Sequence, residues 1–224
     1  MPIPQKAAEQ MPKTIRERVY TELRKWIIDG TLKPGEKISD LDLSVYFSTS
    51  RTPVREAIQL LADQKLIEIY PGKETIVAPI DLNEVHSLYQ IAAELHVLAL
   101  EFAYPHITQI EVDALKKCNQ QFTRAIARGD NATASQADHE FHDIIIKLSS
   151  NYFIREFIKI LSSHIERLQL IDDPDFNLTG KKQDSVEDHE NIIKALENQD
   201  LESAKEAMRH NWLHTIEVAE HRQP

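Results

Sequence analysis

The 224-residue sequence predicts a mainly α-helical protein in two parts: a small N-terminal unit of helices with one β-hairpin, and a larger all-helical unit. Apolar residues recur at helical spacing along most of the chain, whereas residues 66–70 and 75–78 alternate as strands do. Only 5 glycines interrupt this pattern. Charge divides the chain as well, because the first 80 residues carry 12 Lys and Arg against 11 Asp and Glu, and residues 81–224 carry 14 against 25.

The composition is that of an ordinary globular protein, with 42% hydrophobic and 28% charged residues. No apolar run approaches the roughly 20 residues that cross a bilayer, and the N-terminus does not resemble a signal peptide. Cys118 is the only cysteine, so an internal disulfide is excluded. We therefore expect a cytoplasmic protein without membrane contact.

The first part begins with residues 1–13, which contain three prolines and no periodicity and are expected to form a flexible arm. A helix is expected from Thr14 to a C-terminal glycine at Gly30. Residues 31–35 follow as a turn, because they end in Pro34 and Gly35, two residue types that interrupt helices and favour turns.

Two further helices and a hairpin complete the first part. A short helix ends at Phe47, and a second helix runs from about residue 51 to residue 64. The alternating segments 66–70 and 75–78 pair as a hairpin around a Pro-Gly-Lys turn. Three helices followed by a hairpin is the order of a winged helix-turn-helix, which we assign to residues 14–78.

The helix expected from about residue 51 begins with side chains that suit a DNA-reading surface. In a helix-turn-helix this first turn faces base edges in the major groove. Arg51 and Arg55 share one helix face, and Arg suits guanine or a phosphate fork. Ser50 and Thr52 can donate to phosphates. The two arginines alone would equally fit a solvent-exposed helix start, and the order of elements around them favours DNA.

The tip of the hairpin adds two groups that suit a neighbouring groove. Gly72 offers a backbone amide and Lys73 an ammonium group. The near-neutral charge of the first part is compatible with this use, because phosphate contact requires only one basic face. The expected partner is a double-stranded DNA operator.

The first part closely resembles the GntR superfamily of bacterial regulators. The resemblance is carried by the stretches Leu32–Gly35, Ser50–Ala57 and Leu60–Leu66. It implies that the DNA contacts of the family are matched here by Arg51, Thr52, Arg55 and Gly72. Leu41 departs from the pattern, since some FadR-like members have a DNA-contacting arginine at that position.

After a linker at residues 79–81, periodicity predicts six helices within residues 82–221. Asp138 and His142 are four residues apart on the inward stripe of one helix, and His189 turns inward on the penultimate helix. For any single one of these residues, a hydrogen-bonded core position is the simpler interpretation. Together they match the way metal sites are built from facing helices of a bundle, so both interpretations stay open at this point.

Residues 82–221 resemble the FCD ligand-binding domain of the FadR-like branch, a bundle of six or seven helices. Its metal-binding members use Asp-x3-His, a His on the penultimate helix and a fourth ligand on the last helix, and Asp138, His142 and His189 match this order. The fourth position departs from the pattern, because it holds Asn211 where these members usually have a histidine. The apolar stripe of the helix also turns Asn211 inward, and His210, one residue earlier, is the second choice. The resemblance implies a divalent ion, and this ligand set favours Zn, Mn or Ni.

The resemblance also implies a small-molecule effector, of which an organic or sugar acid is the expected class. Many FCD domains carry an Arg on their first helix, but the equivalent position here holds Ala92, with His96 one turn later. His96, His164 and Arg167 are the pocket candidates, although the last two would also fit a solvent-facing helix surface. A homodimer is expected, because it would place two recognition helices about one turn of DNA apart.

The expected function is that of a metabolite-responsive transcriptional repressor, although an activator would use the same parts. A regulator for which the metal ion itself is the effector shares every sequence feature with this interpretation. An all-α metalloenzyme is the weaker alternative. The sequence has no Glu-x-x-His pair, His-Glu-x-x-His motif, Gly-rich phosphate loop or Gly-x-Ser-x-Gly, so we expect no enzyme.

Overall fold

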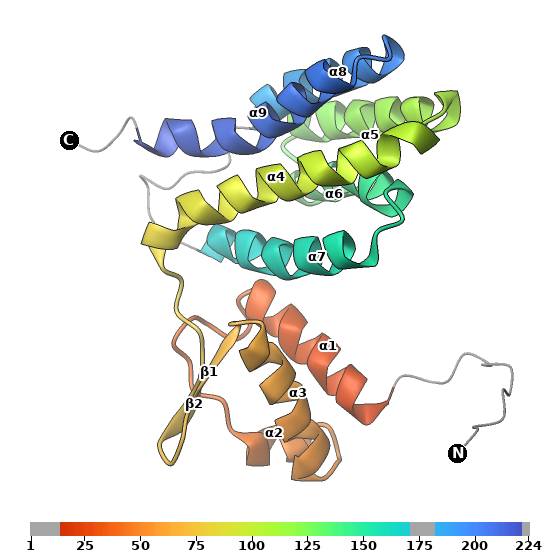
Figure 1. Ribbon diagram of the computed structural model, residues 1–224. Coiled ribbons are helices and arrows are strands. Elements are labelled where there is room, and N and C mark those ends of the chain that lie inside the picture. The colour runs from red at the N-terminus through yellow and green to blue at the C-terminus, as the bar shows by residue number, and fades with distance from the viewer. Residues whose placement is uncertain (1–13, 171–181, 221–224) are drawn as a thin grey trace, which may run out of the picture. The chain divides into compact units, whose positions relative to one another are not determined.

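The computed structural model describes residues 14–170 and 182–220, and the chain divides between Ile80 and Asp81 into two compact units. The predicted mainly α-helical class is confirmed (Figure 1). The arm predicted at residues 1–13 lies outside the described residues. None of the described helices is both long and apolar enough to cross a membrane.

The first unit contains three helices and one hairpin. In chain order these are α1 (Ile15–Ile28), α2 (Asp40–Tyr46), α3 (Arg51–Asp63), β1 (Ile67–Tyr70) and β2 (Glu74–Val77). The strands pair antiparallel, with Ile67 opposite Val77. The apolar stripes of α1 and α3 form the core together with β1, and the fully buried members include Leu23, Leu61 and Leu66. This packing fixes α3 with its opposite face exposed.

Two glycines in this unit occupy backbone conformations that other residues rarely adopt. Gly30, directly after the C-cap of α1, has a φ of 77°, as the prediction of a C-terminal glycine requires. Gly72 at the tip of the hairpin has a φ of 71°, in the left-handed region. An added Cβ at Gly72 would meet nothing within 4 Å, so the backbone angle, and not lack of space, explains the glycine.

The second unit is a bundle of six long helices within the described residues, as predicted. They are α4 (Val85–Ala103), α5 (Gln109–Ala127), α6 (Asn131–Leu148), α7 (Tyr152–Arg167), α8 (Lys182–Glu197) and α9 (Leu201–Glu220). Short 3-10 turns lie at residues 82–84, 104–106 and 168–170. Helix α4 packs against α6, α7 and α9, while α5 lies beside α6 and α8 (Figure 1).

The core of the bundle is apolar but contains several buried polar side chains. Its fully buried members include Leu100, Leu115, Phe141, Ile192 and Met208. Among the polar residues buried in this unit are His96, His142, His189 and Asn211, which come from α4, α6, α8 and α9. Buried polar groups destabilise a fold unless they gain partners, so these residues point to a site.

Helix α5 offers a test of local stability. Thr108 caps the helix, and its own N–H donates to the Glu111 carboxylate at 2.8 Å. We expect Thr108→Ala to lower the free energy of unfolding of the second unit by about 1 kcal/mol, because the cap is lost. Urea unfolding followed by circular dichroism measures this change. Thr108→Ser keeps the hydroxyl and should behave as wild type, so an equal loss in both variants would contradict the capping role.

Candidate DNA-reading surface and metal centre

The predicted DNA-reading residues lie at the start of α3. Arg51 is its first residue and Arg55 lies one turn later, with side chains 49% and 64% exposed. Ser50 is the N-cap, but its side chain makes no capping hydrogen bond. Thr52 is exposed beside it. The structure thus brings these four residues together on one exposed helix end.

Sequence reasoning missed Asp40, the first residue of α2. Its two carboxylate oxygens accept hydrogen bonds from Arg51 Nη2 at 2.6 Å and from Arg55 Nε at 2.5 Å. These two bonds, that from Arg51 first, hold the pKa of the Asp40 carboxyl below its usual value. The only signal in the sequence was an acidic residue near a helix start, which is ordinarily interpreted as a capping preference.

The wing residues lie at the tip of the hairpin, between β1 and β2. Gly72 and Lys73 are both exposed, and the backbone N–H of Lys73 donates to the Tyr70 carbonyl at 3.0 Å. Glu74, the first residue of β2, forms an ion pair at 2.8 Å with Lys37 from the segment before α2. The tip therefore presents one exposed ammonium group and one glycine backbone.

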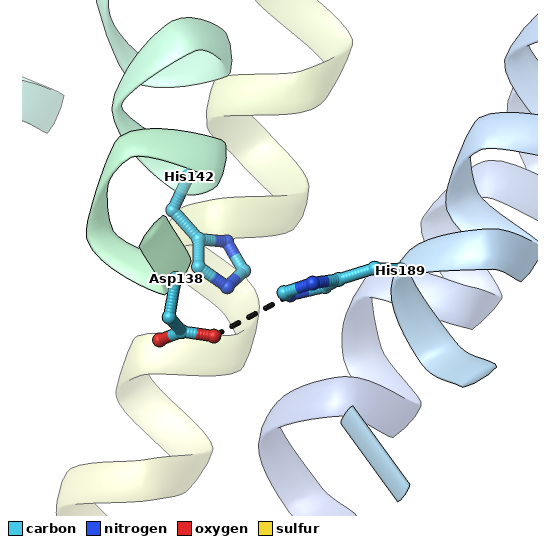
Figure 2. A group of neighbouring side chains, drawn as sticks. All are labelled: Asp138, His142 and His189. Atoms are coloured by element: carbon cyan, nitrogen blue, oxygen red, sulfur yellow. Dashed lines mark ion pairs between the residues drawn. The ribbon is translucent and has the colours of Figure 1, made fainter. Parts of the chain in front are cut away.

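The second site lies inside the helical bundle. Asp138 and His142 project from successive turns of α6 toward His189 of α8 (Figure 2). One ligand atom from each of the three residues lies within 4.8 Å of the other two. Asp138 Oδ1 and His189 Nε2 are 3.5 Å apart. The residues predicted from helix spacing are thus brought together at distances that side-chain adjustment around one ion can close.

Both imidazoles of this triad are held neutral by burial. Burial lowers the pKa of His189 to about 3 and places the pKa of His142 well below its ordinary value. His142 Nδ1 and His189 Nε2 are buried and have no hydrogen-bond partner among the described residues. Neutral imidazole is the form that binds metals, and an ion would satisfy buried nitrogens of this kind. The donor set therefore fits a divalent cation.

Asn119 of α5, which sequence reasoning missed, orients His189. Its side-chain amide donates to the Val186 carbonyl at 3.2 Å, so its Oδ1 faces His189 Nδ1, also at 3.2 Å. With Nδ1–H donating to this oxygen, the lone pair of His189 Nε2 points toward Asp138. An outer partner that fixes the tautomer of a ligating histidine is a regular part of metal sites.

The two candidates for a fourth ligand occupy different surroundings. Asn211 of α9 is 6% exposed, and its side chain forms a hydrogen bond with His142 that opposes the fall of the pKa of that residue. The His210 side chain is 61% exposed, and its Nδ1 lies 2.7 Å from Asp188 Oδ1. The structure places Asn211, the first choice, beside the triad and His210 at the surface.

The effector candidates differ in their burial. His96 is buried, with its ring 5.2 Å from His142 and 4.4 Å from Trp212, measured between centroids. Arg167 is only 2% exposed, so the alternative that it faces solvent is wrong. His164 is half-buried on α7. Trp212, not noticed in the sequence, has a buried indole N–H without a hydrogen-bond partner among the described residues.

Comparisons with known proteins match both units. The bacterial regulatory protein family named gntR matches residues 15–77, and the FCD domain family matches residues 87–213. The chain belongs to the GntR family and carries an FCD domain. It is a transcriptional regulator, and since the matched families and relatives are regulators, the prediction that it is not an enzyme is confirmed.

Relatives of this GntR regulator share its full two-part organisation. It is 25% identical over 205 residues to the uncharacterized HTH-type transcriptional regulator YdhC of Bacillus subtilis, which covers 90% of this chain and 89% of the relative. It is 25% identical over 206 residues to the repressor RspR of Escherichia coli, covering 92% and 88%. The gluconate operon repressor of Bacillus subtilis is 25% identical over 202 residues, covering 87% and 81%.

A solved structure supports the same fold. The E. coli protein McbR/YncC superposes with a TM-score of 0.74 at 19% identity, covering 94% of this chain and 99% of that protein. At this identity the likeness concerns the fold alone. A winged helix-turn-helix joined to a helical domain is thereby established as the architecture of this regulator.

Because His96 is buried, the stability of the metal-free GntR regulator is expected to depend on pH. Burial lowers the pKa of His96 to about 4 in the folded chain, whereas an unfolded histidine titrates near 6.5. Below pH 6.5 the unfolded state therefore binds more protons than the folded state does. The free energy of unfolding falls as the pH is lowered from 6.5 toward 4. Between pH 7 and pH 5 we expect His96 to account for about 2 kcal/mol of this loss.

Urea unfolding of the metal-free protein at both pH values measures this contribution. His96→Gln removes the titrating group and should reduce the pH dependence by about that amount. An unchanged pH dependence in the variant would show that His96 is not held neutral by the fold.

Proposed function

We propose that this GntR regulator is a metabolite-responsive repressor whose FCD domain binds a divalent metal ion and a small-molecule effector. Residues 14–78 bind operator DNA, residues 79–81 link the domains, and residues 82–221 sense the effector. The observation that carries the sensing role is the triad of Asp138, His142 and His189, in which two buried, neutral imidazoles face one half-buried carboxylate. A protein that acts on the chromosome works in the cytoplasm, which is the location we propose.

The DNA contacts follow from the exposed start of α3 and from the wing. Arg51 and Arg55 read base edges or clamp phosphates, and Ser50 and Thr52 donate to the backbone. Gly72 and Lys73 enter the neighbouring groove from the wing tip. The exposure of these side chains supports the proposal, because each can reach an outside partner without unfolding.

The metal is held by Asp138, His142, His189 and Asn211. One carboxylate, two imidazoles and one amide oxygen form a mixed oxygen and nitrogen set that suits Zn, Mn or Ni. Such an ion would supply positive charge and further coordination positions for oxygen atoms of an effector. An amide oxygen binds such an ion more weakly than an imidazole does, so binding of the ion depends more on the oxygen atoms that the effector adds.

The effector is an oxygen-rich organic or sugar acid. The buried indole N–H of Trp212 is a donor only, so a ligand acceptor beside His96 would satisfy it. Two similar proteins are named gluconate operon repressors, one from Bacillus licheniformis and one from Bacillus subtilis. Their names make gluconate and related acids the first compounds to test.

A homodimer completes the proposal. Ile91, Leu98 and Phe102 form one stripe along α4 at helical spacing and are 51%, 39% and 48% exposed. A second copy that covers this stripe would remove apolar surface from water and pair two DNA-binding domains. Each domain then reads one half of a near-palindromic operator.

Fluorescence anisotropy of operator DNA tests the sensing role and separates its alternatives. With the metal bound, a recognised acid should weaken operator binding about 5- to 150-fold, the range of a coupling free energy of about 1–3 kcal/mol. Metal alone, added to chelated protein, should change the affinity for operator DNA by a smaller factor than the acid does. If metal alone controls the affinity and no acid does, the ion is the effector and the metabolite-sensing proposal is wrong.

A further inference from the structure

One carboxylate holds both arginines of the DNA-reading surface. Asp40 begins α2, directly after its N-cap Ser39, and its side chain is 21% exposed. Its Oδ1 accepts from Arg51 at 2.6 Å and its Oδ2 from Arg55 at 2.5 Å. Both oxygens therefore face α3, and the two ion pairs join the start of α2 to the first two turns of the recognition helix α3.

The ion pairs use only part of each guanidinium. A guanidinium carries five N–H donors. Arg51 uses a donor on Nη2, and Arg55 uses the one on Nε. The terminal edge of Arg55, formed by Nη1 and Nη2, therefore stays available for the two parallel hydrogen bonds that read guanine. Asp40 fixes the direction of this edge without covering it.

Asp40 also changes the charge that DNA meets. Two guanidinium groups without a partner would attract any phosphate, and such attraction carries no sequence information. With Asp40 between them the cluster carries one net positive charge, and long flexible side chains lose less conformational freedom on binding because they are already oriented. The carboxylate thus weakens binding to random DNA more than binding to an operator.

We propose that Asp40 is a specificity-determining positioning residue, which orients Arg51 and Arg55 and offsets part of their charge. This inference rests on the proposed DNA-reading role of the two arginines. It concerns selectivity between sequences, and a capping role of Asp40 in α2 would leave selectivity unchanged.

Asp40→Asn tests the inference, with Asp42→Asn as the matched control. Both variants remove one negative charge from the first turn of α2, but among the described residues Asp42 forms no ion pair with α3. Anisotropy titrations against operator and random duplex are run across a salt series. For Asp40→Asn we expect tighter binding to random DNA, a salt dependence steeper by up to about 0.9 in log–log slope, and an operator preference reduced about tenfold.

The control outcomes separate the inference from simpler explanations. Asp42→Asn should keep the operator preference of the wild type, and Asp40→Glu, which retains a carboxylate, should restore most of it. If Asp40→Asn and Asp42→Asn shift both DNAs equally, Asp40 acts through charge alone and the inference is wrong. If the wild type itself prefers no sequence, the proposed DNA-reading function fails instead, so the two failures are distinguishable.

Discussion

Arg51→Ala/Arg55→Ala should abolish the preference of this regulator for its operator. Each bidentate contact between an arginine and a base contributes about 1–3 kcal/mol, so losing two should weaken operator binding by roughly 30-fold to 20,000-fold. Binding to random DNA should weaken less, because it loses only the salt-dependent attraction of two charges and no base contact. Anisotropy titration of both duplexes at fixed salt measures the difference.

Arg16→Ala/Arg18→Ala is the matched control for this double variant. These two arginines are exposed on α1 of the same unit, so the change in net charge is identical. The control should weaken operator and random DNA by similar, salt-dependent factors. Retention of the operator preference by Arg51→Ala/Arg55→Ala, with its fold verified by circular dichroism, would remove α3 from the DNA-reading role.

Substitution of the triad should eliminate the bound metal and the stability that depends on it. At a free metal concentration 100 times Kd, one bound ion stabilises the folded state by about 2.7 kcal/mol. Chelation should therefore lower the free energy of unfolding of the wild type by an amount of this order. His189→Ala and Asp138→Asn should contain no ion by elemental analysis and should show no further loss on chelation.

His139→Ala provides the control for the triad. His139 neighbours Asp138 on α6, but its Nε2 lies 3.5 Å from Glu166 and its side chain is 49% exposed. The Glu166 carboxylate raises the pKa of His139 to about 9, so this residue is a cation and not a metal ligand at neutral pH. His139→Ala should keep one ion and the full response to chelation. A triad variant that also keeps both would show that the three residues are only a polar part of the core.

Helix periodicity and turn chemistry were sufficient to predict the elements of both units. The stripe Val54, Ala57, Ile58 and Leu61 is buried as its spacing requires, and the hairpin forms around Gly72. Asp138 and His142 could be found because four residues along a helix return to the same face. His189 could be found because its own helix has an equally clear apolar stripe. Local pattern is enough where a site is built from regular helices.

The partners of these residues could not be predicted in the same way, because they depend on contacts between elements. Asp40 reaches Arg51 only through the turn that joins α2 to α3, where Ser48 has a φ of 50°. Asn119 and His189 come from α5 and α8, and no periodicity links their positions. The ring of Trp212 meets His96 of α4 for the same reason. Arrangement in space, more than sequence spacing, determines which group orients another.

Sequencing of genomic fragments selected by the metal-loaded protein tests the central claim most directly. A homodimer that places two α3 helices on DNA predicts strong enrichment of a near-palindromic sequence, with half-sites about one helical turn apart. Binding to such a site should exceed binding to random DNA by at least roughly 1,000-fold. Recovery of fragments in proportion to their abundance, without a shared sequence, would contradict the assignment of this chain as a sequence-specific regulator.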